Sequence, residues 1–148
     1  MTVSPEPARL VNTRRFLTHC SLGQFDGMEK LLSPDATYRV PGQHVLSGEH
    51  HGPDQIMRYL RRVLTLTRDT LEVLKWEDWM VGEYHVTALA YLHAQGHGRI
   101  YEGRQLFLVT CDANDLICEI RIFFEDEART ERFFGSDGPW GRWVNDRS

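Results

Sequence analysis

The chain of 148 residues is 41% hydrophobic and 26% charged, an ordinary balance for one globular domain with a buried core. Its formal net charge of -4 gives no broad electrostatic reason to expect a nucleic-acid partner. No stretch approaches the roughly 20 apolar residues of a membrane span, and residues 1–10 lack the apolar run of a signal peptide. Three cysteines without CxxC spacing suit a reducing setting. We therefore expect a single cytoplasmic domain without a membrane partner.

The first half of the chain predicts two helices, a short strand and a third helix. Pro7 suits the first turn of a helix that stops before Gly23, and Asp26 is placed to cap the second helix. Apolar residues at three- and four-residue steps mark the third helix. These elements are expected over residues 7–22, 26–32, 36–40 and 53–64, with a helix break over 33–35 and a loop over 43–52.

The second half predicts four antiparallel strands and a short final helix. The last two strands form a long hairpin over residues 101–126, because Asp and Asn at 112–115 suit a tight turn. Helices grouped at one end of an antiparallel sheet define an α+β fold. The earlier strands are expected over 71–81 and 84–95, and the helix over 127–134.

The hairpin has one apolar face, and we expect helices to cover it and enclose a pocket. Cys118, Ile120, Ile122 and Phe124 alternate with polar neighbours, as in a strand with one buried side. The same parity places three residues of the other arm on this face: Tyr101, Gln105 and Phe107. A fully packed core is the alternative to a pocket. Small residues at 88, 90 and 94 favour the pocket, because they leave room inside a curved sheet.

Three stretches resemble SnoaL-like proteins of the nuclear transport factor 2-like superfamily. LGQFDGMEKLLSPDATYRVPG is similar to the family's second helix and first strand, SGEHHGPDQIMRYL to the lead into its third helix, and YEGRQLFLVTCDANDLICEIRIFFED to its closing hairpin. The match covers roughly residues 8–135 and leaves 136–148 as a tail. It implies a cone-shaped curved antiparallel sheet wrapped around helices, a hydrophobic pocket and often a homodimer. One fold hosts many functions, so the activity has to be argued from the pocket.

The catalytic positions of better-known relatives are mostly apolar in this chain. Ketosteroid isomerases of this fold use a tyrosine and two acids, where this sequence has Phe16, Val40 and Phe107. The last-strand carboxylate of limonene epoxide hydrolases would fall near Ile122. SnoaL-like cyclases carry an acid at the end of the last strand, where this chain has Glu125 and Asp126. The resemblance therefore implies a proton-transferring role for one of these two.

Each candidate catalytic residue also has a structural interpretation. Asp126 or Glu125 could act as acid or base, whereas Asp126 would also make a good cap for the final helix. The Tyr38 phenol could donate to a carbonyl or alkoxide, or satisfy a local partner. His19 is expected near the inward face of the first helix and His93 on the face away from the pocket.

The remaining candidates concern metal binding and the pocket walls. His44, His50 and His51 fit no compact zinc spacing, so no metal site is expected. Trp76 and Trp79 lie three apart on a strand and are expected on opposite faces, with one lining the pocket. The expected substrate-binding residues are Phe16, Val40, Trp76, Tyr101, Gln105, Phe107, Ile120, Ile122 and Phe124.

The leading functional hypothesis is a cofactor-free cyclase or isomerase acting on a hydrophobic, oxygenated small molecule, as the resemblance to polyketide cyclases implies. The alternative is a non-catalytic binding protein or accessory subunit, including one similar to dioxygenase small subunits. The outer face of the sheet would expose a cluster of apolar residues, which predicts a two-fold homodimer. That cluster comprises Leu89, Tyr91, Leu106, Leu108 and Phe123.

Overall fold

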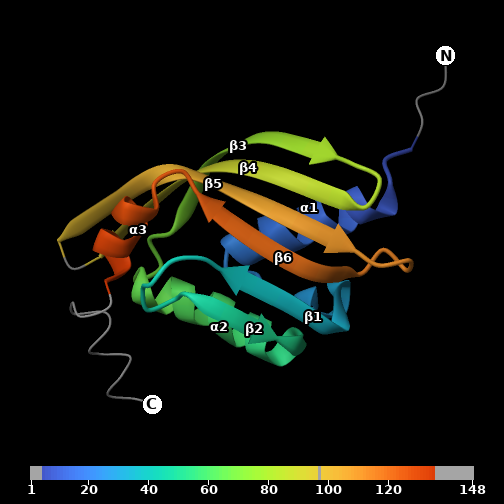
Figure 1. The fold of residues 1–148 in the computed structure, drawn as a ribbon, viewed down its shortest axis with the longest axis horizontal. Coiled ribbons are helices and arrows are strands. Elements are labelled where there is room, and N and C mark those ends of the chain that lie inside the picture. Colours follow the sequence, from blue (N-terminus) through green and yellow to red (C-terminus); the bar gives the residue numbers. More distant parts are fainter. Residues whose placement is uncertain (1–4, 97, 136–148) are drawn as a thin grey trace.

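A computed structural model describes residues 5–96 and 98–135 of the chain. It contains three α-helices, one short 3-10 helix and six strands, in a mixed α+β arrangement (Figure 1). In chain order the elements are α1 (Ala8–Ser21), η1 (Met28–Leu31), β1 (Leu32–Val40), β2 (Gly48–His51), α2 (Gly52–Leu66), β3 (Glu72–Val81), β4 (His85–Gly96), β5 (Arg99–Cys111), β6 (Ile117–Phe124) and α3 (Glu127–Phe134).

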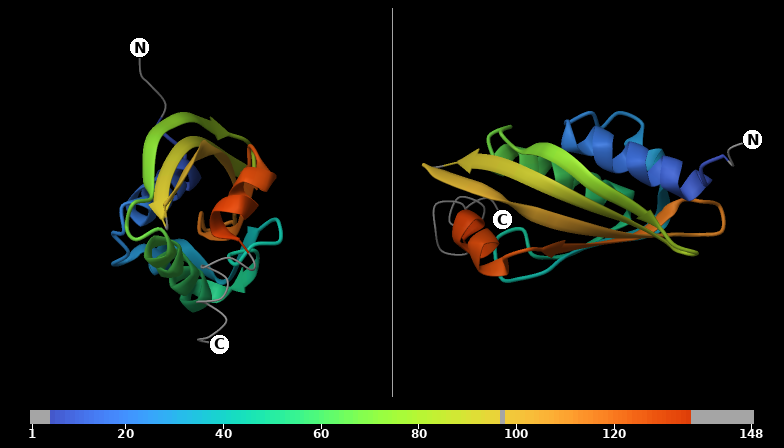
Figure 2. Two further views of the ribbon diagram at one scale, coloured as in Figure 1. Left: turned by 90° about the vertical axis from the view of Figure 1, so that its left-hand side faces the viewer. Right: turned by 90° about the horizontal axis from the view of Figure 1, so that it is seen from above.

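The six strands form one curled, open sheet in the order β2-β1-β6-β5-β4-β3. Strands β3 to β6 are an antiparallel meander, which confirms the predicted hairpin and the strands before it. One pairing differs from the expected antiparallel sheet, because β1 runs parallel to β6. Seen along its length in Figure 2, the sheet wraps around an inner space, with α1 and α2 on its inner side. The predicted α+β fold with a curved sheet is thus confirmed.

The segment before α2 is more regular than the sequence predicted. β1 begins at Leu32 and passes through Pro34, whereas a helix break was expected there. The proline is tolerated because the pairing of β1 with β6 is interrupted between Leu32 and Thr37. Gly48–His51, which was expected to be loop, forms β2 against the end of β1. This pairing depends on a distant segment, and local patterns do not reveal it.

The two tryptophans of β3 lie on the same face, so their expected placement on opposite faces was wrong. The pairing of β3 with β4 shifts between Trp76 and Asp78. This bulge adds one residue between the two tryptophans, and both therefore pair with inward-facing alanines of β4. Their rings stack with centroids 4.9 Å apart.

The core lies between the helices and the concave face of the sheet. Phe16 of α1 and Ile56 of α2 are completely buried there, and so are Ala88 and Ala90 of β4. Alternation along β4 is as predicted, with residues 86, 88, 90, 92 and 94 all buried. No helix in the described part of the chain is long and apolar enough to cross a membrane. The three cysteines are free thiols.

Candidate functional site

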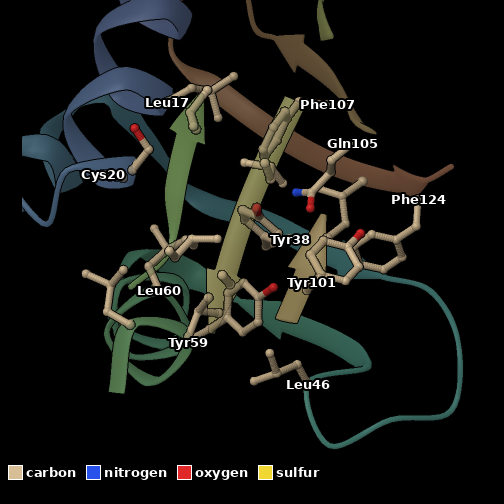
Figure 3. A pocket seen from close by; sticks show the side chains of 18 of the residues that line it. Leu17, Cys20, Tyr38, Leu46, Tyr59, Leu60, Tyr101, Gln105, Phe107 and Phe124 are labelled. Atoms are coloured by element: carbon tan, nitrogen blue, oxygen red, sulfur yellow. The ribbon is translucent and has the colours of Figure 1, made fainter. Parts of the chain in front are cut away.

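A cavity of about 100 Å³ lies between α1, α2 and the concave face of the sheet. Its walls are mostly aliphatic and aromatic, and Figure 3 shows the side chains gathered around this space. The polar side chains that line it come from four elements and one loop: Cys20, Ser21, Tyr38, His44, Tyr59, Tyr101 and Gln105. An apolar chamber with a few polar groups is the usual form of a small-molecule site.

Two tyrosines meet where α2 packs on β1. Tyr38 points inward because it belongs to the buried face of β1, and Tyr59 belongs to the apolar stripe of α2. Their ring centroids are 4.9 Å apart at an interplanar angle of 49°. They are only 3% and 6% exposed, respectively. The pair therefore places two phenols in the wall of the cavity (Figure 3).

No hydrogen bond within the described residues involves either of these phenol hydroxyls, and neither is among the fully enclosed unpaired atoms, so both border space that a ligand can occupy. Burial raises the pKa of Tyr38 well above its ordinary value, and nearby Tyr59 and Cys20 add to the shift. Burial also raises the pKa of Tyr59, and it raises the pKa of the Cys20 thiol to about 12. All three groups are therefore neutral at pH 7. The phenols can donate hydrogen bonds to an oxygen in the cavity without carrying charge.

Tyr101 and Gln105 project inward from β5, as the hairpin parity predicted (Figure 3). The Tyr101 hydroxyl is engaged, because the Thr130 hydroxyl of α3 donates to it over 3.2 Å. Its ring also packs on Phe133, with centroids 5.6 Å apart. The Gln105 amide is half-buried and makes no side-chain hydrogen bond within the described part of the chain. Gln105 is thus free to contact a ligand, whereas Tyr101 mainly joins α3 to the sheet.

Seven of the predicted site residues line the cavity: Phe16, Tyr38, Tyr101, Gln105, Phe107, Ile122 and Phe124. Three predicted substrate-binding residues lie elsewhere. Val40 and Ile120 are buried in the surrounding core. Trp76 lies in a surface groove of about 800 Å³ beside the cavity. Four residues line both spaces, so the groove adjoins the cavity: Ser21, Leu64, Leu71 and Val73. Substrate contact by any of these residues stays a prediction.

The structure places the predicted acids outside the cavity lining. Glu125 lies at the outer face of the sheet, where its carboxylate is 3.2 Å from the Arg104 guanidinium. The Asp126 carboxylate accepts a hydrogen bond from the backbone N–H of Arg129 over 3.0 Å, which confirms it as the cap of α3. Of the described residues that line the cavity, none is an Asp or a Glu. A catalytic role for either acid stays a prediction.

The histidines are distributed over the molecule. His19 is half-buried and borders a shallow surface hollow outside the cavity. His93 lies on the outer face, as predicted, with its ring nitrogen 3.0 Å from the Glu102 carboxylate. The described residues contain no group of three or more His, Cys, Asp or Glu placed to hold a metal ion. His44, by contrast, lines the cavity.

Tyr59 and His44 are among the lining residues that the sequence did not place in the site. Tyr59 occupies the same helical stripe as Ile56, Leu60 and Val63, so its spacing could have identified it as inward-facing. His44 gave no local signal, because it belongs to the irregular loop between β1 and β2. Its position depends on how that loop folds against α3.

The chain belongs to the SnoaL-like domain family, whose model matches residues 13–120. The predicted family is thereby confirmed. The uncharacterized protein Rv0034 of Mycobacterium tuberculosis is 27% identical over 129 residues, which cover 87% of this chain and 98% of that protein.

Several solved structures have a similar fold, among them a putative cyclase and a ligand complex. A putative SnoaL-like polyketide cyclase from Jannaschia sp. CCS1 has a TM-score of 0.69 and 18% identity, covering 94% of this chain and 99% of its own. Rv0760c of Mycobacterium tuberculosis, in complex with estradiol-17β-hemisuccinate, has a TM-score of 0.67 and 16% identity. That match covers 80% of this chain and 94% of the other. At these identities the likeness concerns the fold alone.

Proposed function

We propose that the protein binds an apolar, oxygenated small molecule in the cavity between its helices and its sheet. The observation that carries this proposal is the pair of buried phenols, Tyr38 and Tyr59, whose hydroxyls have no described partner. These hydroxyls border the cavity, where an oxygen of a ligand would accept a hydrogen bond from them. The apolar walls supply the remaining affinity through the hydrophobic effect.

The size of the cavity constrains how such a ligand sits. About 100 Å³ is well below the roughly 300–1,000 Å³ of typical sites for drug-sized ligands. The adjoining groove offers further room, and Leu64, Leu71 and Val73 form walls common to both spaces. A compact ring would occupy the cavity, and a longer substituent would extend along the groove.

A cyclase or isomerase activity is the second candidate. Neutral donors in a site shielded from water stabilise negative charge that develops on a carbonyl oxygen during cyclisation or enolisation. Tyr38 and Tyr59 are such donors, because their raised pKa values keep them protonated. The polyketide cyclase with a similar fold supports this direction. The base would be the substrate itself or Asp126, which would have to approach the cavity from its present position.

Native mass spectrometry of the purified protein tests the binding function. We expect the protein to retain a small apolar molecule, or to capture one from an extract that contains aromatic polyketides. A captured molecule released with unchanged mass and structure would identify a binding protein. A rearranged product formed without added metal or nucleotide would identify a cyclase or isomerase. Failure to capture any apolar compound would contradict the proposal.

The outer face of the sheet supports a further proposal, that two copies of the chain associate there. Phe123 is 40% exposed, and half-buried leucines at 89, 106 and 108 surround it. Charged side chains border this patch, including Arg104, which lies 2.6 Å from the Glu77 carboxylate. An apolar centre with a polar rim is the usual composition of a protein interface.

Sedimentation velocity at micromolar concentration tests the dimer. We expect a dimer for the wild type and a monomer for Leu106→Asp, because a charge at the centre of the patch would be buried without a partner. The control is Leu22→Asp, at an exposed leucine that follows α1. A wild-type protein that sediments as a monomer would rule out association through this face.

A further inference from the structure

The two ring nitrogens of His44 have different surroundings. The backbone N–H of Leu46 donates to Nδ1 over 3.2 Å. Because Nδ1 accepts, a neutral ring must carry its proton on Nε2. His44 is 7% exposed, and burial lowers the pKa of the ring, opposed by weaker influences of Glu131 and the Pro41 carbonyl. The ring is therefore neutral at pH 7 with a defined tautomer.

The Nε2–H group of this tautomer is buried and has no hydrogen-bond partner among the described residues. The Pro41 carbonyl lies near enough to the ring to raise its pKa as a hydrogen-bond acceptor does, but it does not reach hydrogen-bond geometry with Nε2, which stays unpaired among the described residues. Most buried donors in proteins are paired, so an unpaired one in the wall of a cavity requires an explanation.

The loop that carries His44 is anchored on both sides. The backbone N–H of His44 donates to the Ser47 hydroxyl over 3.0 Å, and that hydroxyl donates to the Pro41 carbonyl over 3.0 Å. The backbone N–H of Val45 donates to the carbonyl of Gly135, just after α3, over 3.2 Å. These bonds hold the backbone on either side of the ring, so the position of the ring is defined before any ligand arrives.

Two aromatic side chains orient the imidazole at the cavity wall. The ring stacks on Phe134 with centroids 5.5 Å apart, and Phe124 meets it edge-on at 5.9 Å. Both phenylalanines line the same cavity. Phe124 is half-buried and Phe134 is buried. A ligand oxygen would reach Nε2 by displacing Phe124, which is the less enclosed of the two.

We propose that the Nε2–H group of His44 donates a hydrogen bond to a carbonyl oxygen of the ligand and thereby selects ketone- or quinone-type compounds over their hydrocarbon analogues. This inference rests on the proposed binding function and assigns a substrate class to it. A hydrocarbon of the same shape would leave the donor unpaired, and a carbonyl would satisfy it. His44 is thus a specificity residue that acts in its neutral form.

Two probes of matched shape test this selection: acetophenone, which has a carbonyl, and α-methylstyrene, which has a methylene group in its place. We expect the wild type to bind acetophenone about tenfold more tightly, the usual effect of leaving a buried donor unpaired. In His44→Phe, which keeps an aromatic ring and removes the donor, this preference should fall toward one.

The matched control is His50→Phe. His50 also has a buried Nε2 without a described partner, but it stacks on Tyr59 outside the cavity, with centroids 4.4 Å apart. We expect this variant to keep the wild-type preference. A second measurement uses the wild type alone, so it does not depend on how the variants fold. In ¹⁵N-imidazole NMR spectra, His44 should show the Nε2–H tautomer, and acetophenone but not α-methylstyrene should shift its signal.

The outcomes separate this inference from the binding function. If acetophenone binds but His44→Phe keeps the preference, or if the His44 signal does not move, then His44 is not the selecting donor and the binding function stands. An Nδ1–H tautomer in the free protein would overturn the inference without any ligand. If neither probe binds the wild type, the cavity is not a ligand site and both proposals fail.

Discussion

The hydroxyl groups of the cavity tyrosines differ in what they contact. Those of Tyr38 and Tyr59 border the cavity and make no hydrogen bond within the described part of the chain, whereas the Tyr101 hydroxyl receives a hydrogen bond from Thr130. A group retained in an unsatisfied environment contributes little to folding and is available for another purpose. The tyrosines therefore differ in role: Tyr38 and Tyr59 are available to a ligand, whereas Tyr101 stabilises the contact between α3 and the sheet.

Replacing each tyrosine by phenylalanine tests that separation. We expect Tyr38→Phe and Tyr59→Phe to leave the free energy of unfolding nearly unchanged, because neither hydroxyl makes a hydrogen bond within the described part of the chain. Tyr101→Phe should lower it by about 1 kcal/mol, since a formed hydrogen bond is lost. Urea denaturation measures all three. Equal destabilisation by all three substitutions would show that the first two hydroxyls do have partners in the folded protein.

Residue patterns predicted one side of the cavity and missed the other. The two-residue period of the hairpin correctly placed Tyr101, Gln105 and Phe107 inside, because a strand has only two faces. His44 could not be predicted, since its loop is held by hydrogen bonds from Gln43 to Glu131 of α3 and from Val45 to Gly135, which are far away in the sequence. Ile120 had the correct parity but is not in the lining, because parity gives the face and not the depth, and Val40, expected from the family resemblance, is also buried in the core.

Some elements do not match the sequence prediction. In each of these, the structure depends on pairing between segments that are distant in the sequence. The bulge between Trp76 and Asp78 is not visible as an interruption of the hydrophobic pattern, yet it brings both tryptophans to one face. β2 forms because the end of β1 offers an edge to pair with. By contrast, the hairpin and α3 were predicted closely, because their turn and cap residues act locally.

The cap of α3 gives a test that separates a structural from a catalytic role of Asp126. Asp126→Ala should lower the free energy of unfolding by about 1 kcal/mol, whereas Asp126→Asn should retain the cap. If Asp126 only caps the helix, then Asp126→Asn will turn over substrate as the wild type does, once a substrate is known. Loss of turnover in a stably folded Asp126→Asn protein would instead support the proton-transferring role implied by the family resemblance.

For the whole molecule, the buried titratable groups predict a stability plateau. Burial lowers the pKa of His44 and His50 below their ordinary value of 6.5, so below that pH the unfolded chain binds protons more readily. For His50, Arg62 and His51 lower the pKa further. Stability is therefore complete above about pH 6.5 and falls as the pH drops through the lowered pKa values.

At alkaline pH the folding stability changes in the opposite direction, because it declines as the pH rises. Burial raises the pKa of Cys20 above its ordinary value of 9.0 and the pKa values of Tyr38 and Tyr59 above 10.0. The unfolded chain loses these protons first, so stability declines above about pH 9. Urea midpoints measured from pH 5 to 11 should show this plateau, and His44→Phe and His50→Phe should each flatten its acid side. A wild-type profile without a decline below pH 6.5 would contradict the buried, neutral histidines.

The measurement that tests the cavity most directly is an NMR titration with acetophenone of the wild type and of Ala94→Leu. Ala94 of β4 is buried in the cavity wall, so a leucine side chain at this position would fill the space in which we expect the ligand to bind. We predict at least a tenfold loss of affinity, about 1.4 kcal/mol, with the fold preserved. Thr18→Leu places the same leucine side chain in the groove alone and should bind as the wild type does. If Ala94→Leu binds acetophenone with wild-type affinity, the ligand binds elsewhere and the cavity is not the functional site.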